Sequence, residues 1–392
     1  MRIITALCAL TPGFLSGLEI EIRYDFDTNN FFDTAEKRAA MEAVADFYGS
    51  MIQDNLLEID VTPFQLEDTG NTWTAFINNP STGSQVSLFE LVVPEDTIIV
   101  YVGSRDLSGN LRGIASPGGF EFYGFPNWNS RVRARGQAGA DVDSAPTEVA
   151  PWGGVIAFDD ATNWNFSLTE NLPGVEFVTV ALHEMGHVLG IGTTSVWDSL
   201  VVDGNFTGSA TTQSNGSSPS ADFSHFTNSL SSPFFGSFGV SHGGDGPVLM
   251  LPVFFDDNNT VGVVTDLDLA ALVDLGWELS LPPSLGVISL SPSSSSFTWP
   301  SNSFFSYEIA RMSSLGTQSG GSPIFDGDGS MQSWSDPSPL SERAFYQLRT
   351  TTSVPNSVTA PAPSVQAAKS VGTIRSYTIP PRVVTGCCSA HQ

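Results

Sequence analysis

One short motif constrains the fold more than any other part of this chain. The sequence HEMGH, residues 183–187, lies within the stretch GVEFVTVALHEMGHVLGIG. Apolar residues recur around it at helical spacing, so we predict an amphipathic helix over about residues 175–189, ended by the glycines that follow. Residues four apart on a helix project from the same face. His183 and His187 can therefore reach one ion from a shared face.

The chemistry of these residue types indicates zinc. Imidazole nitrogens bind Zn²⁺ at about 2.0–2.1 Å, and a hydrolytic zinc site keeps one coordination position open for water. Glu184 follows His183 directly and can reach a water at that position. We therefore predict that His183 and His187 are metal ligands and that Glu184 is a general base.

The third ligand decides between a structural and a hydrolytic site, because structural zinc takes four protein ligands. No glutamate occurs between Glu184 and Glu278, and Glu278 follows the end of a predicted helix. The remaining candidates are His225, His242 and nearby aspartates.

We favour His225 as the third ligand and keep His242 as the alternative. Phe223 and Phe226 flank His225 and could anchor its ring, and Asp222 is near enough to serve as an outer partner. His242 lies in the glycine-dense sequence SHGGDG, which would hold an imidazole poorly.

Composition excludes several classes of protein. Lysine and arginine total 15 against 41 aspartates and glutamates, a net charge of -26 that repels nucleic acid. Residues 136–310 contain no lysine or arginine. The three cysteines provide neither a disulfide framework nor a cysteine metal site, and no later segment is apolar enough to span a membrane.

The order of predicted elements indicates a mixed α/β (α+β) domain. Residues 18–26 alternate as a half-buried strand and precede a helix over residues 35–55. The apolar runs 97–103 and 152–159 are typical of buried strands. A closing helix over residues 265–275 has Thr265 as N-cap, Asp268 in a capping box and Gly276 as its stop.

Composition along the chain predicts four parts. Residues 1–17 read as a secretory signal peptide, because Arg2 precedes an apolar run. Residues 18–280 form the catalytic domain, residues 284–350 a small all-β module, and residues 351–392 a flexible tail rich in Ser, Thr, Pro and Val.

These residues together resemble the metzincin zinc endopeptidases, whose motif is HExxHxxGxxH. The chain supplies His183, Glu184, His187 and Gly190, but Thr193 stands where the third histidine belongs. This is similar to leishmanolysin-like members, in which an insertion, here residues 196–224, precedes the third ligand. The resemblance implies that His225 closes the site.

Further features carry the resemblance over residues 18–280. Met250 in VLMLP matches the methionine turn of the family, and TDLDLAALVDLGW resembles the closing helix of matrixin-like and serralysin-like domains. WGGVIAFDDATNW resembles the matrixin edge strand that runs along the substrate cleft. A peptide would then lie antiparallel to the strand near residues 155–158.

The resulting hypothesis is a secreted zinc endopeptidase that cleaves protein or peptide substrates, with Glu184 as base toward a water activated by the metal. A non-catalytic, metal-stabilised surface or adhesion module is the alternative, although such a module has no use for Glu184. Hydrolysis of a non-peptide substrate would use the same residues. Calcium at the acidic loop 256–259 is a further candidate, but such clusters are more often turns. The sequence leaves the oligomeric state open.

Overall fold

The computed structural model describes residues 17–64, 70–141, 145–167, 172–227, 230–236, 245–254 and 264–279, and shorter stretches between 286 and 390. The predicted signal peptide lies outside the described residues, apart from Gly17. The chain divides into two compact units. One contains residues 18–277 and 360–392, and the other residues 1–17 and 278–359.

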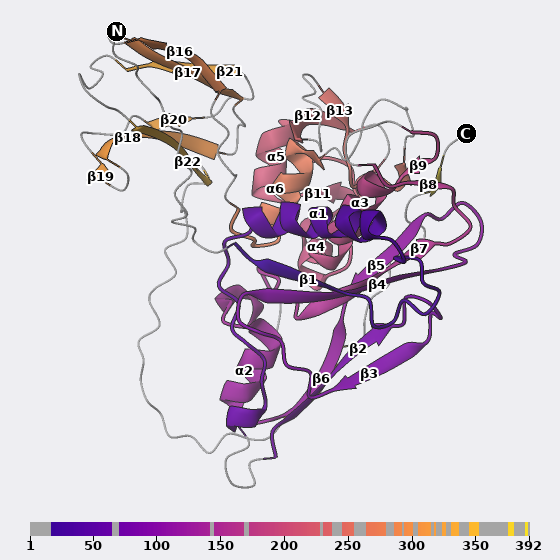
Figure 1. The fold of residues 1–392 in the computed structure, drawn as a ribbon. Coiled ribbons are helices and arrows are strands. Elements are labelled where there is room, and N and C mark those ends of the chain that lie inside the picture. Colours follow the sequence, from indigo (N-terminus) through magenta and orange to yellow (C-terminus); the bar gives the residue numbers. More distant parts are fainter. Residues whose placement is uncertain are drawn as a thin grey trace. The chain divides into compact units, whose positions relative to one another are not determined.

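A twisted mixed sheet forms the centre of the first unit (Figure 1). Its order is β1 (Glu19–Arg23), β4 (Thr97–Arg105), β7 (Gly153–Asp159) and β5 (Gly113–Pro117). The first three strands are parallel, and β5 is antiparallel to β7. The continuous apolar sequence of β4 explains its internal place, because a strand covered on both faces needs apolar residues at every position.

The edge of this sheet differs from the sequence expectation. β7 is paired on both sides, with Tyr101 of β4 opposite Val155 and Ala115 of β5 opposite Ile156. The prediction that this strand is the edge strand was therefore wrong. Every residue of β7 is buried, which is typical of an interior strand. Among the described strands, β5 forms this edge of the sheet.

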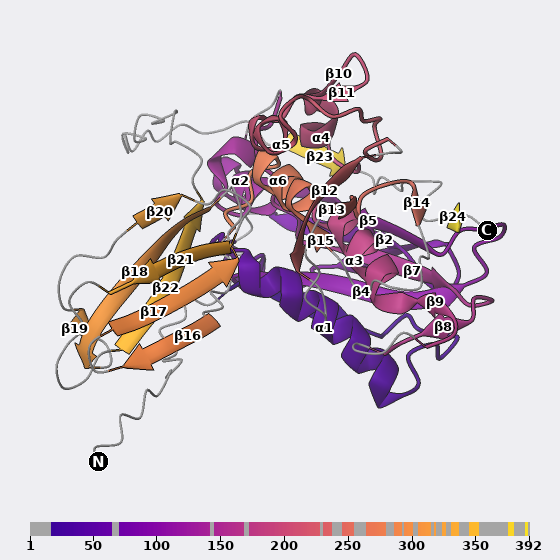
Figure 2. The same ribbon diagram turned by 90° about the horizontal axis from the view of Figure 1, so that it is seen from above.

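Two helices cover one face of the sheet (Figure 2). They are α1 (Ala35–Met51) and α3 (Phe177–Val188), and the Tyr48 hydroxyl of α1 donates to the Leu182 carbonyl of α3 at 3.1 Å. α1 ends before residue 55, where the pattern predicted its end. Ile52 turns to an extended conformation, and its carbonyl accepts the Leu18 N–H at 3.1 Å.

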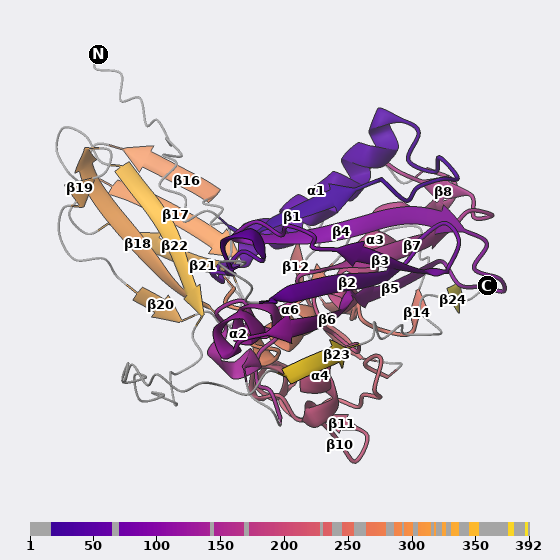
Figure 3. The same ribbon diagram turned by 90° about the horizontal axis from the view of Figure 1, so that it is seen from below.

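A second, antiparallel sheet covers the other face of the main sheet (Figure 3). Its order is β23 (Arg375–Ile379), β6 (Gly119–Gly124), β2 (Thr72–Asn78) and β3 (Gln85–Phe89). Between the two sheets lies a core rich in aromatic side chains, in which Trp73 and Trp152 meet edge to face at 6.1 Å. Helix α2 (Pro126–Ala134) follows β6.

Residues 351–392 contain regular structure that the sequence did not predict. β23 pairs antiparallel with β6, and β24 (Ser389–Ala390) pairs in parallel with β14 (Val253–Phe254). At these residues the expectation of an irregular tail is wrong. Short strands such as β23 and β24 have no apolar alternation that would predict them from the sequence. They form because a neighbouring strand offers backbone hydrogen bonds.

The remaining elements of the first unit precede α3 or follow it along the chain. They are β8 (Trp164–Asn165), β9 (Val175–Glu176), α4 (Ser195–Leu200), β10 (Val201–Val202), β11 (Asn205–Phe206), α5 (Ser209–Asn215), β12 (Ser231–Gly236), β13 (Asp245–Pro247), β15 (Val264–Thr265) and α6 (Asp266–Asp274). α6 has Thr265 as its N-cap, as predicted. The prediction of a mixed α/β domain is thus confirmed.

In the second unit the described residues form strands. They are β16 (Gly286–Ser291), β17 (Ser294–Pro300), β18 (Phe305–Ser314), β19 (Thr317–Gln318), β20 (Ile324–Asp326), β21 (Met331–Ser335) and β22 (Phe345–Thr352). Over the described part of the chain, no helix combines the length and apolar character needed to cross a bilayer.

Candidate metal centre

Helix α3 begins at a side-chain cap that the pattern did not reveal. The Glu176 carboxylate accepts the backbone N–H groups of Val178 and Thr179 at 3.2 and 2.8 Å. Residues 175–176 belong to β9, so the helix starts two residues later than predicted. The carboxylate also suits the positive end of the helix dipole.

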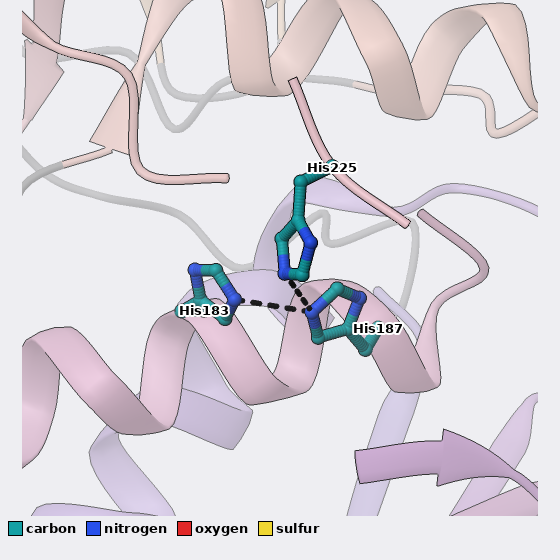
Figure 4. A group of neighbouring side chains, drawn as sticks. All are labelled: His183, His187 and His225. Carbon is teal, nitrogen blue, oxygen red and sulfur yellow. Dashed lines mark hydrogen bonds between the residues drawn. The ribbon is translucent and has the colours of Figure 1, made fainter. Parts of the chain in front are cut away.

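The structure brings His183 and His187 of α3 together with His225 from a loop 38 residues beyond His187 (Figure 4). The Nε2 atom of His187 lies 3.0 Å from Nε2 of His183 and 3.2 Å from Nε2 of His225. All three side chains are buried, with exposures of 0–3%. Two nitrogens bound tetrahedrally to one zinc would lie about 3.3 Å apart.

Backbone carbonyls set the protonation of two of these rings. His183 Nδ1 lies 2.8 Å from the Leu249 oxygen, and His187 Nδ1 lies 2.7 Å from the Ile191 oxygen. A carbonyl oxygen only accepts, so each Nδ1 carries the proton and each neutral ring presents an Nε2 lone pair. Lone pairs facing each other at 3.0 Å repel, and a cation between them removes the repulsion. The donor set therefore fits Zn²⁺.

Burial keeps these rings neutral. It lowers the pKa of His183 to about 4 and, together with the nearby His183 ring, the pKa of His225 to about 3. Burial and the two neighbouring rings hold the pKa of His187 well below its usual range. Neutral imidazole is the form that binds metal.

Glu184 is fully buried on α3, between the two helix histidines. The helix packs against β5 and β7, and the Glu184 side chain faces the start of β5, where a Cβ on Gly113 would meet its Oε1 at 2.5 Å. The carboxylate is thus an ionisable group buried on the helix that carries His183 and His187.

The loop that carries His225 is held differently from the expectation. Phe226 is buried and its N–H donates to the Met250 carbonyl at 3.1 Å, but Phe223 is 57% exposed and anchors nothing in the core. The Asp222 carboxylate accepts the backbone N–H groups of Ser224 and His225 at 2.7 and 2.8 Å. It therefore shapes the turn, and the expected role beside the imidazole is not what the structure shows.

The segment between Gly190 and His225 supplies the support for this loop. Trp197 of α4 packs on Phe206 and Phe226, with ring centroids 4.4 and 5.3 Å apart, and its indole N–H donates to the Asp222 carbonyl at 2.9 Å. Residues of this segment thus build a small aromatic core next to the loop that carries His225.

The chain turns sharply after α3. Two glycines and a threonine make this turn, and none of them provides a metal ligand: Gly190, Gly192 and Thr193. Gly190 and Gly192 have φ of 112° and 69°, and a side chain on Gly192 would collide with the Ser224 carbonyl. The hydroxyl of Thr193 donates to the His187 carbonyl at 2.7 Å. Thr193, at the position of the missing histidine, therefore caps the helix end.

Met250 lies against α3 at Gly186, where a Cβ on Gly186 would approach its Sδ to 2.7 Å. Asp268 of α6 fixes this turn, because its carboxylate accepts the Leu249 and Met250 N–H groups at 3.1 and 3.0 Å. The same carboxylate accepts the Thr265 N–H at 2.8 Å. Asp268 was predicted only as a cap.

Sequence reasoning missed the carbonyls behind the rings and the second role of Asp268. The carbonyls have no signal in sequence, because any residue provides one. Asp268 had a partial signal, since an acidic residue on an apolar closing helix needs buried partners. His242 and the acidic loop 256–259 lie outside the described residues, so the alternative ligand and the calcium hypothesis stay predictions.

The Matrixin family profile matches residues 139–213, less than half of the chain. The matched region contains β7, Glu184 and both helix histidines, and it ends before His225. Neither a curated protein nor a solved structure matches this chain. The profile match and the buried histidine cluster together support a metzincin-like zinc peptidase domain.

Proposed function

We propose, from the matrixin match and the three-histidine cluster, that residues 18–277 contain the active site of a zinc-dependent endopeptidase. The observation that carries this proposal is the convergence of three neutral imidazoles, two of them on the helix that also carries the buried Glu184. His183, His187 and His225 would hold the metal, which leaves a fourth position for water.

Zinc, when bound, would polarise the peptide carbonyl and lower the pKa of a coordinated water. Glu184 accepts the proton of the attacking water and transfers it to the leaving amine nitrogen as the C–N bond breaks. The Leu249 and Ile191 carbonyls keep His183 and His187 in the required tautomer throughout.

The substrate backbone would pair with β5. Among the described strands this one forms the edge of the main sheet beside α3, and an extended peptide can add to such an edge through backbone hydrogen bonds. This replaces the expected position near residues 155–158, because β7 has no unpaired edge.

Secretion is part of the proposal. The apolar run at residues 3–15 after Arg2 supports an exported product. N-terminal sequencing of protein recovered outside the producing cell should begin at Leu18.

The replacement Glu184→Gln tests the mechanism. We expect it to abolish cleavage of an unfolded protein substrate while one zinc per chain stays bound, because the base is lost and the ligands are kept. Zinc is measured by atomic absorption and cleavage by peptide release. Cleavage above a small fraction of the parent rate would refute the mechanism. A zinc-bound parent protein without hydrolytic activity would favour the non-catalytic module.

A further inference from the structure

Gly113, the first residue of β5, lies directly against the Glu184 side chain. A Cβ built on Gly113 would meet Glu184 Oε1 at 2.5 Å, Cγ at 2.6 Å and Cδ at 2.7 Å. The φ of Gly113 is outside the left-handed region, so other residues could adopt this backbone conformation. The position therefore requires glycine for space and not for conformation.

Glu184 could not easily move aside for a larger residue. The Cγ atom is in conflict as well as the carboxylate oxygen, so turning the terminal group would not relieve the contact. Glu184 is 0% exposed, and Gly113 is held in register opposite Phe158 of β7. A close-packed interior leaves no free volume for a new rotamer.

A glycine in a strand is otherwise unfavourable, since it costs conformational entropy and contributes no packing. Such a residue marks a place where another group approaches the backbone closely. Here the approaching group is the proposed general base.

We propose that Gly113 is a positioning residue for Glu184. Its missing side chain lets the edge strand pass directly over the glutamate, on the helix that carries His183 and His187, and so confines the carboxylate. This inference rests on the proposed function, because it assigns Gly113 a role in the proton transfer made by Glu184.

The first test is Gly113→Ala in the zinc-loaded protein. Relieving the contact displaces Glu184 by up to about 1 Å, so we expect kcat to fall about 10²-fold with little change in KM. Zinc stoichiometry and the absorption spectrum of the cobalt-substituted protein should stay as in the parent, because the ligands are untouched. Retention of half the parent kcat, or loss of the metal, would overturn the proposal.

The second test does not depend on activity. In metal-free protein, Gly113→Ala should lower the thermal unfolding midpoint, and this loss should largely vanish in a Glu184→Ala background, which removes Cγ and Cδ. An equal loss in both backgrounds would overturn the proposed contact. Gly109→Ala is the control. Its φ of 67° will itself make alanine unfavourable, but nothing lies within 4 Å of a Cβ there, so its effect should not depend on residue 184.

These tests separate the two proposals. A parent protein that cleaves no peptide defeats the proposed function. It also defeats the positioning role of Gly113 in proton transfer, even if the stability effects of Gly113→Ala and Glu184→Ala depend on each other. A parent that cleaves peptides together with an active, zinc-bound Gly113→Ala variant defeats only the role of Gly113.

Discussion

Each histidine of the cluster is neutral in the fold, which gives the metal-free protein a defined dependence on pH. The pKa of His183 is about 4 in the fold and near 6.5 in an unfolded chain. As the pH falls from about 6.5 to about 4, the unfolded chain binds protons that the fold excludes. The free energy of unfolding should therefore decrease across this range and be insensitive to these rings above it.

Thermal unfolding in the presence of a chelator, at pH values from 8 to 4, measures this dependence. A variant with glutamine at residues 183, 187 and 225 is the control, because it lacks the titrating rings. The difference between parent and variant isolates their contribution. A parent that gains stability relative to the variant on acidification would contradict the neutral state of the cluster.

Two single substitutions test which histidine is the third ligand. His225→Ala should lower zinc affinity by orders of magnitude and eliminate peptide cleavage, because one of the three ligand nitrogens is lost. His242→Ala should leave both unchanged. Zinc titration with a competing chelator measures the affinity, and the reverse pattern would move the ligand to His242.

Single residues differed in how far the sequence could predict them. The spacing of His183 and His187 follows from helix geometry, so it was readable directly. The prediction of His225 used neighbours whose roles differ in the structure, since Phe223 is exposed and Asp222 binds backbone N–H groups. Contacts of this kind depend on tertiary packing and have no local pattern.

At the level of elements, α6 and the methionine turn act together on the metal site. Asp268 of α6 accepts the Leu249 N–H, and the Leu249 carbonyl faces His183 Nδ1. Asp268→Ala should therefore loosen the turn and lower zinc affinity about 10–100-fold, with His183, His187 and His225 intact.

Asp274→Ala is the matched control for that change, because Asp274 lies on the same helix but accepts N–H groups of Ala210 and Thr211 at the start of α5. Zinc titration and thermal unfolding of both variants are compared. We expect both variants to lose stability equally. Only Asp268→Ala should also lose zinc affinity. Unchanged affinity in Asp268→Ala would show that the turn holds its place without the carboxylate.

Elements with a strong period were predictable, but their neighbours were not. The apolar run of β4 and the capped helix α6 formed close to the expected bounds. The prediction that β7 is an edge strand was wrong, because its antiparallel partner β5 has the sequence GIASP, which shows no clear strand pattern. Pairing of strands is decided by packing across the sheet, which the local sequence does not record.

At the scale of the whole chain, the candidate metal site lies within the stretch that has no lysine or arginine. Residues 136–310 contain no lysine or arginine, and this stretch carries helix α3, the three clustered histidines and Met250. A local excess of negative charge attracts a divalent cation, and no lysine or arginine of this stretch competes for the same position. The acidity that excluded nucleic acid as a partner is therefore compatible with metal binding.

The far C-terminal residues complete the first unit, because β23 extends the second sheet along β6 over five residue pairs. Deleting residues 353–392 removes this strand and leaves the backbone edge of β6 unpaired, so the thermal unfolding midpoint should fall by roughly 5 °C or more. Zinc content and low-temperature activity should persist, since the second sheet lies on the face of the main sheet opposite α3. Deleting only residues 380–392 retains β23 and should preserve the midpoint. An equal fall in both truncated proteins would assign the stabilisation to the pairing of β24 with β14 instead.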